Sequence, residues 1–509
     1  MSSTRKLLAA TLAMALGVSV AACSSDGTSD GGAATTGSAT STTSASAATD
    51  RPDGPSATVD RELTAGSTFI GTSRSIDLDA AGYEQHEYQV SGSATAYAGD
   101  QPANGEWDLA PTGEPADYTT RIVVRRPADA STANGSVVVE WLNVSGGVDA
   151  DPDFGYLSDE ILRSGTTWVG VSAQHIGIEG GPTAVQIGGD NALIASVQGK
   201  GLKAISPERY GELSHPGDSY SYDLYSQVAR TVWSNEAGIL GDLDPTHVVA
   251  IGESQSAFAL TTYADGVQPL TKLFDGFFIH SRGGAALPLA GDGPSFDIAG
   301  SIGGVPTKIR TDLDVPVLMF QTESDVAGLL GYLPARQDDT DLIRTWEVAG
   351  AAHVDRFLLG EMADASGCEP PVNDGPQQHL VGMAALRSLL TWIDDGTVPP
   401  TSPRLVVDDA GAYERDDDGI VLGGIRTPVV DVPVDVLSGE SAPGASVFCL
   451  LAGGTTPLTA EQLAARYDSA EDYEQQFEAS TDEAIDAGFV LADDRDTLLD
   501  AAQPDRIAS

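Results

Sequence analysis

The stretch HVVAIGESQSAFALTTYA, residues 247–264, decides the fold. It begins with an apolar, partly β-branched run that is typical of a buried strand, and its second half is compatible with a helix. The tight turn between the two would hold Ser254 above the edge of a sheet, where a serine hydroxyl can act as a nucleophile. The amide of Gln255 would then begin the helix and donate a hydrogen bond to an oxyanion.

Such a turn requires small residues on both sides of the nucleophile. Gly252 meets this requirement, whereas Ser256 stands where a second glycine is usual. This replacement weakens the motif, and Ser254 as an ordinary helix cap is the alternative. The strand before the turn and the helix after it favour the nucleophile.

Further apolar, β-branched runs are expected to form strands. They are TRIVVR (120–125), SVVVEWL (136–142), TWVGVSA (167–173), FDGFFIH (274–280), VPVLMFQ (315–321) and IRTWEVA (343–349). Stretches compatible with helices lie between them, at 153–163, 220–233, 254–264 and 377–395. Near-continuous apolar strands that alternate with helices predict an α/β fold, with a mostly parallel central sheet flanked by helices.

Two long segments rich in Gly and Pro, 176–219 and 283–311, interrupt this alternation. Both are longer than ordinary connections, so we expect them to be insertions that pass over an active site. Residues from about 401 onward are expected to form an appended C-terminal region. Because no second linker or repeat occurs, residues 57–505 are predicted to form a single domain.

A nucleophilic serine needs a base, and the chain has seven histidines. The expected chain order of nucleophile, acid and base leaves His280, His353 and His379 as candidates. No acid-bearing strand separates Ser254 from His280, and His379 lies in a helix-like stretch. His353 follows a predicted strand in a loop of Gly and Ala residues, so it is the predicted base.

The acid is expected after the preceding strand, which runs into Thr-Glu-Ser-Asp at residues 322–325. Either Glu323 or Asp325 can orient the imidazole and stabilise its charged form. Asp325 matches the usual position better and is the predicted acid, with Glu323 as the alternative. The carboxylate that is not used is expected to face solvent or a ligand.

A second oxyanion donor is expected where the strand 136–142 ends in WLNVSGG. Glycines at this point allow backbone amides to approach a carbonyl oxygen. The amide of Val144 or Ser145 is the predicted donor, in addition to that of Gln255. An ordinary Gly-rich turn is the alternative.

The chain is strongly acidic, with 27 Lys and Arg against 74 Asp and Glu and a net charge of −47. Such a surface repels phosphate backbones, which argues against a nucleic-acid partner. It also repels an anionic bilayer, so any membrane attachment is expected to use an anchor. No CxxC or HExxH motif occurs, and neither a metal nor another cofactor is predicted.

The N-terminus has the features of an export signal. Arg5 and Lys6 precede an apolar stretch, 7–20, that is shorter than the roughly 20 residues needed to span a bilayer. Val-Ala-Ala-Cys follows at residues 20–23 and is similar to a bacterial lipobox. In that motif Cys23 becomes the lipid-carrying first residue; an incidental Cys23 after ordinary cleavage is the alternative.

These features predict three consecutive parts: a signal peptide over 1–22, a disordered tether over 23–56, and the folded domain. We expect the domain to be held at the outer face of the cell membrane by lipid on Cys23. With Cys23 used in this way, Cys368 and Cys449 remain, and an even remainder in an exported protein predicts a disulfide. Two free buried thiols are the alternative.

The chain resembles the bacterial "α/β hydrolase domain" family over about residues 60–500. The segments that carry the resemblance are GESQSAFALTTY, EWLNVSGG, SHPGDSYSYDLYSQ, FIHSRG, VPVLMFQTESD, WEVAGAAHVD, GGIRTPVVDVP and the contexts of the last two cysteines. The resemblance implies an α/β-hydrolase fold and a site made of Ser254, His353 and either Asp325 or Glu323. It also implies that Ser256 is normal at its position.

The same resemblance draws attention to five further polar residues as candidates for the lining of a substrate pocket: His175, His215, Asp218, His280 and Arg282. A helix cap for Asp218 and strand-end packing for His280 are equally good interpretations.

Together these observations predict an exported serine hydrolase that cleaves a small carboxylic ester through an acyl-serine intermediate. One alternative is an amidase or peptidase with the same triad. Another is a non-catalytic surface lipoprotein that binds a ligand, although such a protein has no need of all three catalytic groups.

Overall fold

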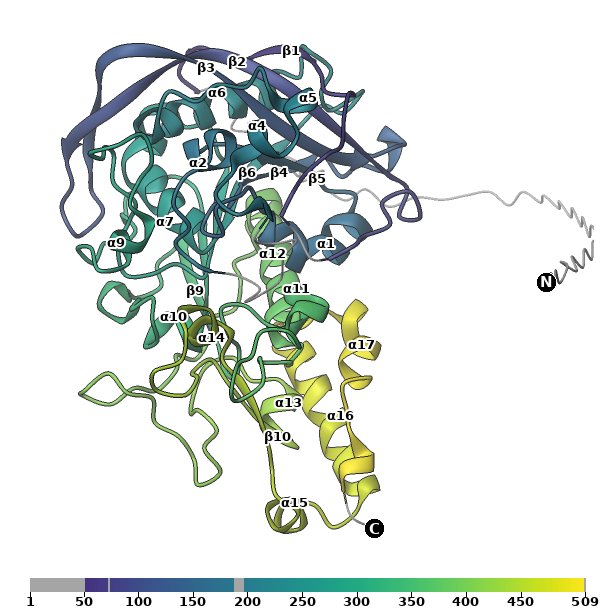
Figure 1. Ribbon diagram of the computed structural model, residues 1–509. Helices are drawn as coiled ribbons and strands as arrows, with labels where there is room; N and C mark the ends of the chain where they lie inside the picture. The colour runs from purple at the N-terminus through teal and green to yellow at the C-terminus, as the bar shows by residue number, and fades with distance from the viewer. Residues whose placement is uncertain (1–50, 72–73, 187–195, 508–509) are drawn as a thin grey trace, which may run out of the picture. The chain divides into compact units, whose positions relative to one another are not determined.

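The computed structural model describes residues 51–71, 74–186 and 196–507 (Figure 1). The chain divides into two units, and all of the described residues belong to the second, Ala48–Ser509. The predicted signal peptide, Cys23 and the tether as far as residue 50 lie outside the described residues.

The second unit is built on a nine-stranded sheet in the order β1-β2-β3-β5-β4-β6-β7-β8-β9. Strands β4 to β9 run parallel to one another, whereas β1, β2 and β3 pair antiparallel and β3 pairs antiparallel with β5. The strands are β1 (Thr58–Glu62), β2 (Tyr83–Asp100), β3 (Asp108–Pro127), β4 (Ser136–Trp141), β5 (Thr167–Val171), β6 (His247–Glu253), β7 (Gly276–His280), β8 (Val317–Thr322) and β9 (Ile343–Val348). The predicted mostly parallel sheet is confirmed.

Helices cover both faces of the sheet (Figure 1). Among the described residues up to 395, the α-helices are α1 (Pro152–Ser164), α2 (His175–Glu179), α4 (Gly201–Ile205), α5 (Pro207–Tyr210), α6 (Ser221–Ser234), α7 (Gln255–Thr262), α8 (Gln268–Thr271), α9 (Ile298–Ile302), α10 (Glu323–Val326), α11 (Arg356–Leu359) and α12 (Gln377–Asp395). Helix α1 illustrates the local signals, because Pro152 begins it with a preset φ and Gly165 ends it at φ 76°.

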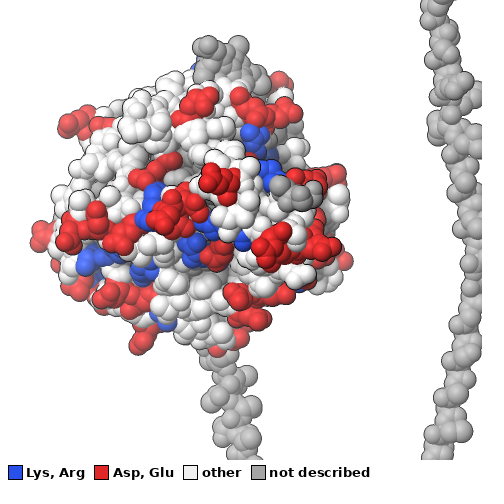
Figure 2. All heavy atoms as spheres, turned by 90° about the horizontal axis from the view of Figure 1, so that it is seen from below, with Lys and Arg blue, Asp and Glu red and all other residues white. Residues whose placement is uncertain are grey.

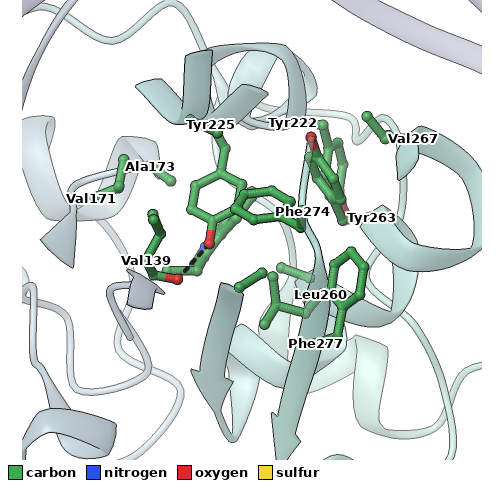
Figure 3. Packing of buried hydrophobic residues seen from close by; sticks show 14 of the residues in the cluster. Val139, Val171, Ala173, Tyr222, Tyr225, Leu260, Tyr263, Val267, Phe274 and Phe277 are labelled. Carbon is green, nitrogen blue, oxygen red and sulfur yellow. Dashed lines mark hydrogen bonds between the residues drawn. The ribbon is translucent and has the colours of Figure 1, made fainter. Parts of the chain in front are cut away.

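The alternation of side chains along each parallel strand divides the core into two layers. In β6, Val249 and Ile251 pack with α1 and α12 on one face, whereas Val248 and Ala250 pack with α6 and α7 on the other. Figure 3 shows the second layer, in which the Tyr225 hydroxyl donates to the carbonyl of Val139 at 2.7 Å. Burial on both faces explains why these strands lack polar alternation.

The region after residue 395 contains two short strands and five helices among its described residues. They are α13 (Pro428–Asp431), β10 (Asp435–Ser438), α14 (Val447–Ala452), β11 (Gly454–Pro457), α15 (Ala460–Arg466), α16 (Ala470–Asp486) and α17 (Arg495–Leu499). Strands β10 and β11 pair with each other and not with the main sheet. Helices α16 and α17 lie side by side (yellow in Figure 1).

The predicted disulfide is present between Cys368 and Cys449, whose Cα atoms lie 5.5 Å apart. It joins the C-terminal region to the segment between α11 and α12. Both cysteines are buried in an apolar cluster with Leu359, Val372 and Phe448. The bond therefore lies within packed structure and not at the surface.

On the face that Figure 2 shows, acidic side chains are spread over the surface and basic side chains lie among them. None of the described helices is both long and apolar enough to cross a membrane. Within the described residues, no group of His, Cys, Asp or Glu side chains is arranged to hold a metal ion.

Candidate active site

The order of the strands creates a natural place for a site at the carboxyl ends of β4 and β6. The chain passes from β4 to β5 on one side and later returns to β6 on the other side of β4. In open α/β sheets, ligands bind in the crevice that opens where the direction of strand addition reverses. Asn143 follows β4 and Ser254 follows β6, so both lie at this crevice.

Ser254 occupies the turn between β6 and α7 with φ 59° and ψ −123°. A positive φ is unusual for a residue with a side chain and is typical of a strained functional turn. At Gly252, a Cβ atom would lie 2.9 Å from Cβ of Ser256 and 3.1 Å from Cδ1 of Leu260, which leaves no room for a side chain. The turn therefore needs glycine before the serine, whereas Ser256 fits after it.

The loops after β8 and β9 bring an acid and a base to Ser254. Nε2 of His353 lies 2.8 Å from Oγ of Ser254, and its Nδ1 lies 2.7 Å from Oδ1 of Asp325. Oδ2 of Asp325 accepts from the backbone N–H of Thr322 at 2.7 Å and from its hydroxyl at 2.8 Å. The carboxylate is thus held by its own loop while its free oxygen faces the imidazole.

The backbone of His353 is held by two hydrogen bonds, and its imidazole lies between two carboxylates. Ser324 accepts from the backbone N–H of His353 at 3.1 Å, and Gln378 donates to its carbonyl at 3.2 Å. Burial alone would lower the pKa of His353, but the carboxylates of Glu253 and Asp325 outweigh it, so the pKa lies above its ordinary value. Charge stabilisation of this kind favours the imidazolium that forms when a base accepts a proton.

Glu323, the alternative acid, has no contact with His353 among the hydrogen bonds and ion pairs of the described residues. It is fully buried and accepts from the amides of Gly350 at 2.5 Å and Gly439 at 3.1 Å, and it pairs with Arg415 at 3.2 Å. The prediction that the second carboxylate faces solvent or a ligand is therefore wrong. Glu323 instead ties the C-terminal region to the loops around the site.

The predicted oxyanion donors are the backbone amides of Gln255, Val144 and Ser145. They lie around Ser254 and differ in the hydrogen bonds that they already donate. Gln255 is the first residue of α7, whose leading amides have no partner within the helix. The Val144 amide donates to Oε1 of Gln255 at 3.2 Å, and the Ser145 amide donates to Oδ1 of Asn143 at 2.8 Å. Of the two predicted second donors, Val144 has the longer and weaker bond to its present acceptor.

Two cavities meet at Ser254. The larger, which we call the large chamber, has a volume of about 160 Å³. It is lined by Gly71, Asn143, Ser145, Gly146, Val148, Ala150, Asp151, Pro152, Val185, Glu253, Ser254, His353, Val354, Leu358, Leu359, Met362, Phe448 and Leu451. The small chamber, of about 40 Å³, is lined by Ser145, Ala184, Val185, Ser254, Gln255, Phe258, Leu287, Ile298, Ile302, Leu329, Leu330, Val447 and Leu451.

Both predicted insertions and the C-terminal region contribute to these walls. Ala184 and Val185 come from the first insertion and Ile298 from the second, while Phe448 and Leu451 come from α14. The disulfide at Cys449 belongs to the same helix as Phe448, and its partner segment continues from the lining residues of α11. It therefore joins two pieces of the large chamber's wall.

The five additional polar candidates line neither chamber. Asp218 accepts from the amides of His175 and Phe296, and His215 contacts the carbonyl of Ala173. These bonds hold loops of the two insertions together.

Two of the five are completely buried at the end of β7 and in the residues that follow. His280 lies 2.7 Å from Asp153, and Arg282 donates to the carbonyls of Gly283, Gly284 and Thr307. Strand-end packing is thus the better interpretation of His280.

Sequence reasoning missed Glu253, which contacts His353, and Asn143, which contacts Glu253. Oε1 of Glu253 lies 3.1 Å from Nε2 of His353, and the side chain of Asn143 donates to the carbonyl of Glu253 at 3.1 Å. An acidic residue directly before the serine was a visible signal for the first. Asn143 could have been noticed from its place in the loop after β4.

A serine in a strained strand-to-helix turn, hydrogen-bonded to a histidine and through it to an acid at the carboxyl ends of a mostly parallel sheet, defines the class of α/β hydrolases. The chain belongs to the family described as "Alpha/beta hydrolase domain", whose model matches residues 51–500. No curated protein matches the sequence.

Several solved structures are similar to parts of the chain. A thermostable esterase from Pseudomonas putida is 13% identical with a TM-score of 0.29, and the match covers 57% of this chain and 81% of the esterase. A fungal esterase from Rhizomucor miehei is 13% identical with a TM-score of 0.29, covering 62% and 91%. A serine hydrolase without a lid from Xanthomonas campestris is 11% identical with a TM-score of 0.27, covering 57% and 93%.

Proposed function

We propose that the protein is a serine hydrolase that cleaves a carboxylic ester. The observation that carries this proposal is the hydrogen-bonded series of Ser254, His353 and Asp325, with distances of 2.8 Å and 2.7 Å. A hydroxyl, an imidazole and a carboxylate in this order form the arrangement that activates serine for acyl transfer. Two chambers that open at Ser254 support the proposal, because an ester has one group on each side of its carbonyl.

In the first step, Oγ of Ser254 attacks the ester carbonyl carbon while Nε2 of His353 takes the hydroxyl proton. Asp325 holds the ring with Nδ1 protonated and stabilises the imidazolium. The carbonyl oxygen becomes an oxyanion, to which the amide of Gln255 donates. We assign the second donor to Val144. Its amide now donates to the side-chain oxygen of Gln255 and would donate to the substrate's oxyanion instead.

The imidazolium then returns its proton to the departing alkoxide, and the alcohol leaves behind an acyl group on Ser254. A water molecule takes the place of the alcohol, and His353 removes its proton as it attacks the acyl carbon. Collapse of the second oxyanion releases the acid and restores the serine hydroxyl. No cofactor takes part in either half of the reaction.

Labelling with a fluorophosphonate tests this proposal, because the probe bonds covalently to serines that are activated by a base. We expect Ser254 to be labelled in the wild type and labelling to be lost in Ser254→Ala, with an unchanged circular dichroism spectrum. Ester hydrolysis should fall by about 10⁶-fold in the same variant. Labelling at another serine, or faster turnover of matched anilides than of esters, would contradict the assignment.

We further propose that the protein is exported and held at the outer face of the cell membrane by lipid on Cys23. The support for this proposal is the sequence alone: a short basic and apolar leader, Ala-Ala before the cysteine, and a polar stretch after it. With a net charge of −47, the chain needs an anchor to stay near an anionic bilayer.

A further inference from the structure

The chemistry of the two chambers limits the substrates that can reach Ser254. Among the described residues, the small chamber has no charged side chain in its lining. The charged or titratable lining residues of the large chamber are Asp151, Glu253 and His353, and Asp151 is paired with Arg125 at 2.5 Å behind the wall. The remaining walls are mostly aliphatic. Apart from the imidazole of His353, which already faces the carboxylates of Glu253 and Asp325, the described lining of neither chamber carries a basic side chain.

Because the reacting carbon must sit at Oγ of Ser254, its two substituents must project into the two chambers. We propose that the substrate is an uncharged ester with a short apolar group for the small chamber and a bulkier apolar group for the large chamber. This inference rests on the proposed hydrolase function. An anionic group would lose its water among apolar walls and lie near Glu253 without a partner, which is strongly unfavourable.

Paired substrates test the charge rule, by which we mean the proposal that the substrate is uncharged. We expect kcat/KM for p-nitrophenyl hemisuccinate to be at least about tenfold lower than for the uncharged p-nitrophenyl butyrate, whose chain has a similar length. Equal turnover of the two esters would overturn the charge rule. Fluorophosphonate labelling of Ser254 in the same preparation separates this failure from a failure of the proposed function.

Variants of the chamber walls test the size rule, by which we mean that the small chamber takes the short group and the large chamber the bulkier group. Two series of esters are used, one in which the length of the acid varies and one in which the length of the alcohol varies. Phe448→Ala should extend the tolerated length in one series only, and Leu329→Trp should shorten it in the other series only. Leu450→Ala on the same helix as Phe448 is the control, since Leu450 lines neither chamber. A shift of the same series by both chamber variants, or of no series, would refute the assignment of one group to each chamber.

A second inference concerns Glu253, whose carboxylate lies close to the same nitrogen of His353, Nε2, that the hydroxyl of Ser254 contacts. Oγ of Ser254 lies 2.8 Å from this nitrogen and Oε1 of Glu253 lies 3.1 Å from it. A neutral imidazole accepts the serine proton at Nε2, whereas a protonated imidazole donates there and can bond the carboxylate. Glu253 is 5% exposed, and the side chain of Asn143 donates to its backbone carbonyl at 3.1 Å and to its Oε2 at 3.5 Å.

We propose that Glu253 is a positioning residue for His353, whose protonated ring it holds at Nε2 between two carboxylates. The ring would then be stabilised after it takes the serine proton, and it would also be harder to deprotonate before the reaction. The other titratable groups around Glu253 are His280 at the end of β7, Asp153 and Tyr156 on α1, and Asp325 after β8. Burial raises the pKa of Glu253 to about 7. Because Glu253 and His353 face each other at 3.1 Å, the proton bound by one affects the proton bound by the other.

The pH dependence of kcat/KM in Glu253→Gln tests this role. Glu253 raises the pKa of His353, so its loss should move the acid limb of the profile to lower pH. The plateau should fall at the same time, because the imidazolium loses one of its two carboxylates. An unchanged acid limb, or one that moves to higher pH, would show that Glu253 does not act through His353, whatever happens to the plateau.

Fluorophosphonate labelling of Glu253→Gln and its unfolding midpoint serve as controls. A purely structural loss would lower the midpoint and the amount of active enzyme without moving the pH profile. If Glu253→Gln is not labelled at any pH, the substitution has disrupted the serine site itself. In that case Glu253→Asp, which keeps the charge, is the variant to test. It should be labelled and should keep the acid limb of the wild type. Failure of Glu253→Asp on both counts would overturn the proposal.

Discussion

Exchange of Asp325 for asparagine and of Glu323 for glutamine should separate catalysis from stability. The two carboxylates are only two residues apart and both are fully buried, yet their partners differ. Asp325 contacts His353, whereas Glu323 contacts backbone amides and Arg415. Each substitution removes a charge with little change in size, so the outcomes can be compared directly.

In Asp325→Asn, the amide oxygen can still accept from Thr322, which leaves the amide nitrogen to face Nδ1 of His353. Nδ1 must then act as an acceptor, so the proton moves to Nε2 and the ring can no longer accept from Ser254. Loss of the correct tautomer should lower kcat by about 10⁴-fold, which corresponds to about 5.5 kcal/mol of transition-state stabilisation. The urea midpoint should change little.

In Glu323→Gln, the variant loses a buried charge opposite Arg415 and must place an amide group among donors that all require an acceptor. Removing one partner of a buried pair costs about 3 kcal/mol or more in the free energy of unfolding. We expect a lower urea midpoint and near-normal kcat per active site, with active sites counted by fluorophosphonate titration. The reasoning fails if Glu323→Gln is the inactive variant while Asp325→Asn keeps its activity.

Three further predictions concern other parts of the chain. Replacing Cys368 and Cys449 together by serine should lower the free energy of unfolding by about 4 kcal/mol, because the bond closes a loop with a sequence separation of 81; equal stability of the wild type with and without reductant would contradict this. Ser256→Ala should keep or raise stability by about 1 kcal/mol, because the buried hydroxyl of Ser256 has no hydrogen-bond partner among the described residues; a lower melting temperature would refute it. Cys23→Ala should move the protein out of the membrane fraction, and a soluble wild type that starts at another residue would disprove the anchor.

The central strands could be predicted because their physical environment leaves a strong local signal. Burial on both faces makes segments such as His247–Glu253 apolar throughout, and each of the predicted runs lies within or overlaps a strand of the sheet. The strand Tyr83–Asp100 was missed because one of its faces is largely polar and it contains Gly, Ser and Ala. For the same reason only the apolar end of β3, which has 20 residues, was predicted.

The site was predictable as far as it depends on strand ends. Ser254, Asp325 and His353 each follow a strand of the parallel sheet, and the structure brings them within hydrogen-bond distance; their catalytic roles stay predictions. Glu323 accepts a hydrogen bond from the amide of Gly439, which is far away in the sequence, and no local sequence pattern predicts such a contact. The wall formed by Phe448 was unpredictable for the same reason.

Phe448 on α14 shapes the large chamber but takes no part in the catalytic hydrogen bonds, so substrate specificity and catalysis depend on different parts of the chain. Substitutions of this side chain alter the large chamber but leave the hydrogen bonds among Ser254, His353 and Asp325 untouched. The disulfide at the neighbouring Cys449 holds the backbone of the helix, so a change in side-chain size is less prone to displace it. Substitutions at this one position can therefore change which substrates fit, while Ser254, His353 and Asp325 stay as they are.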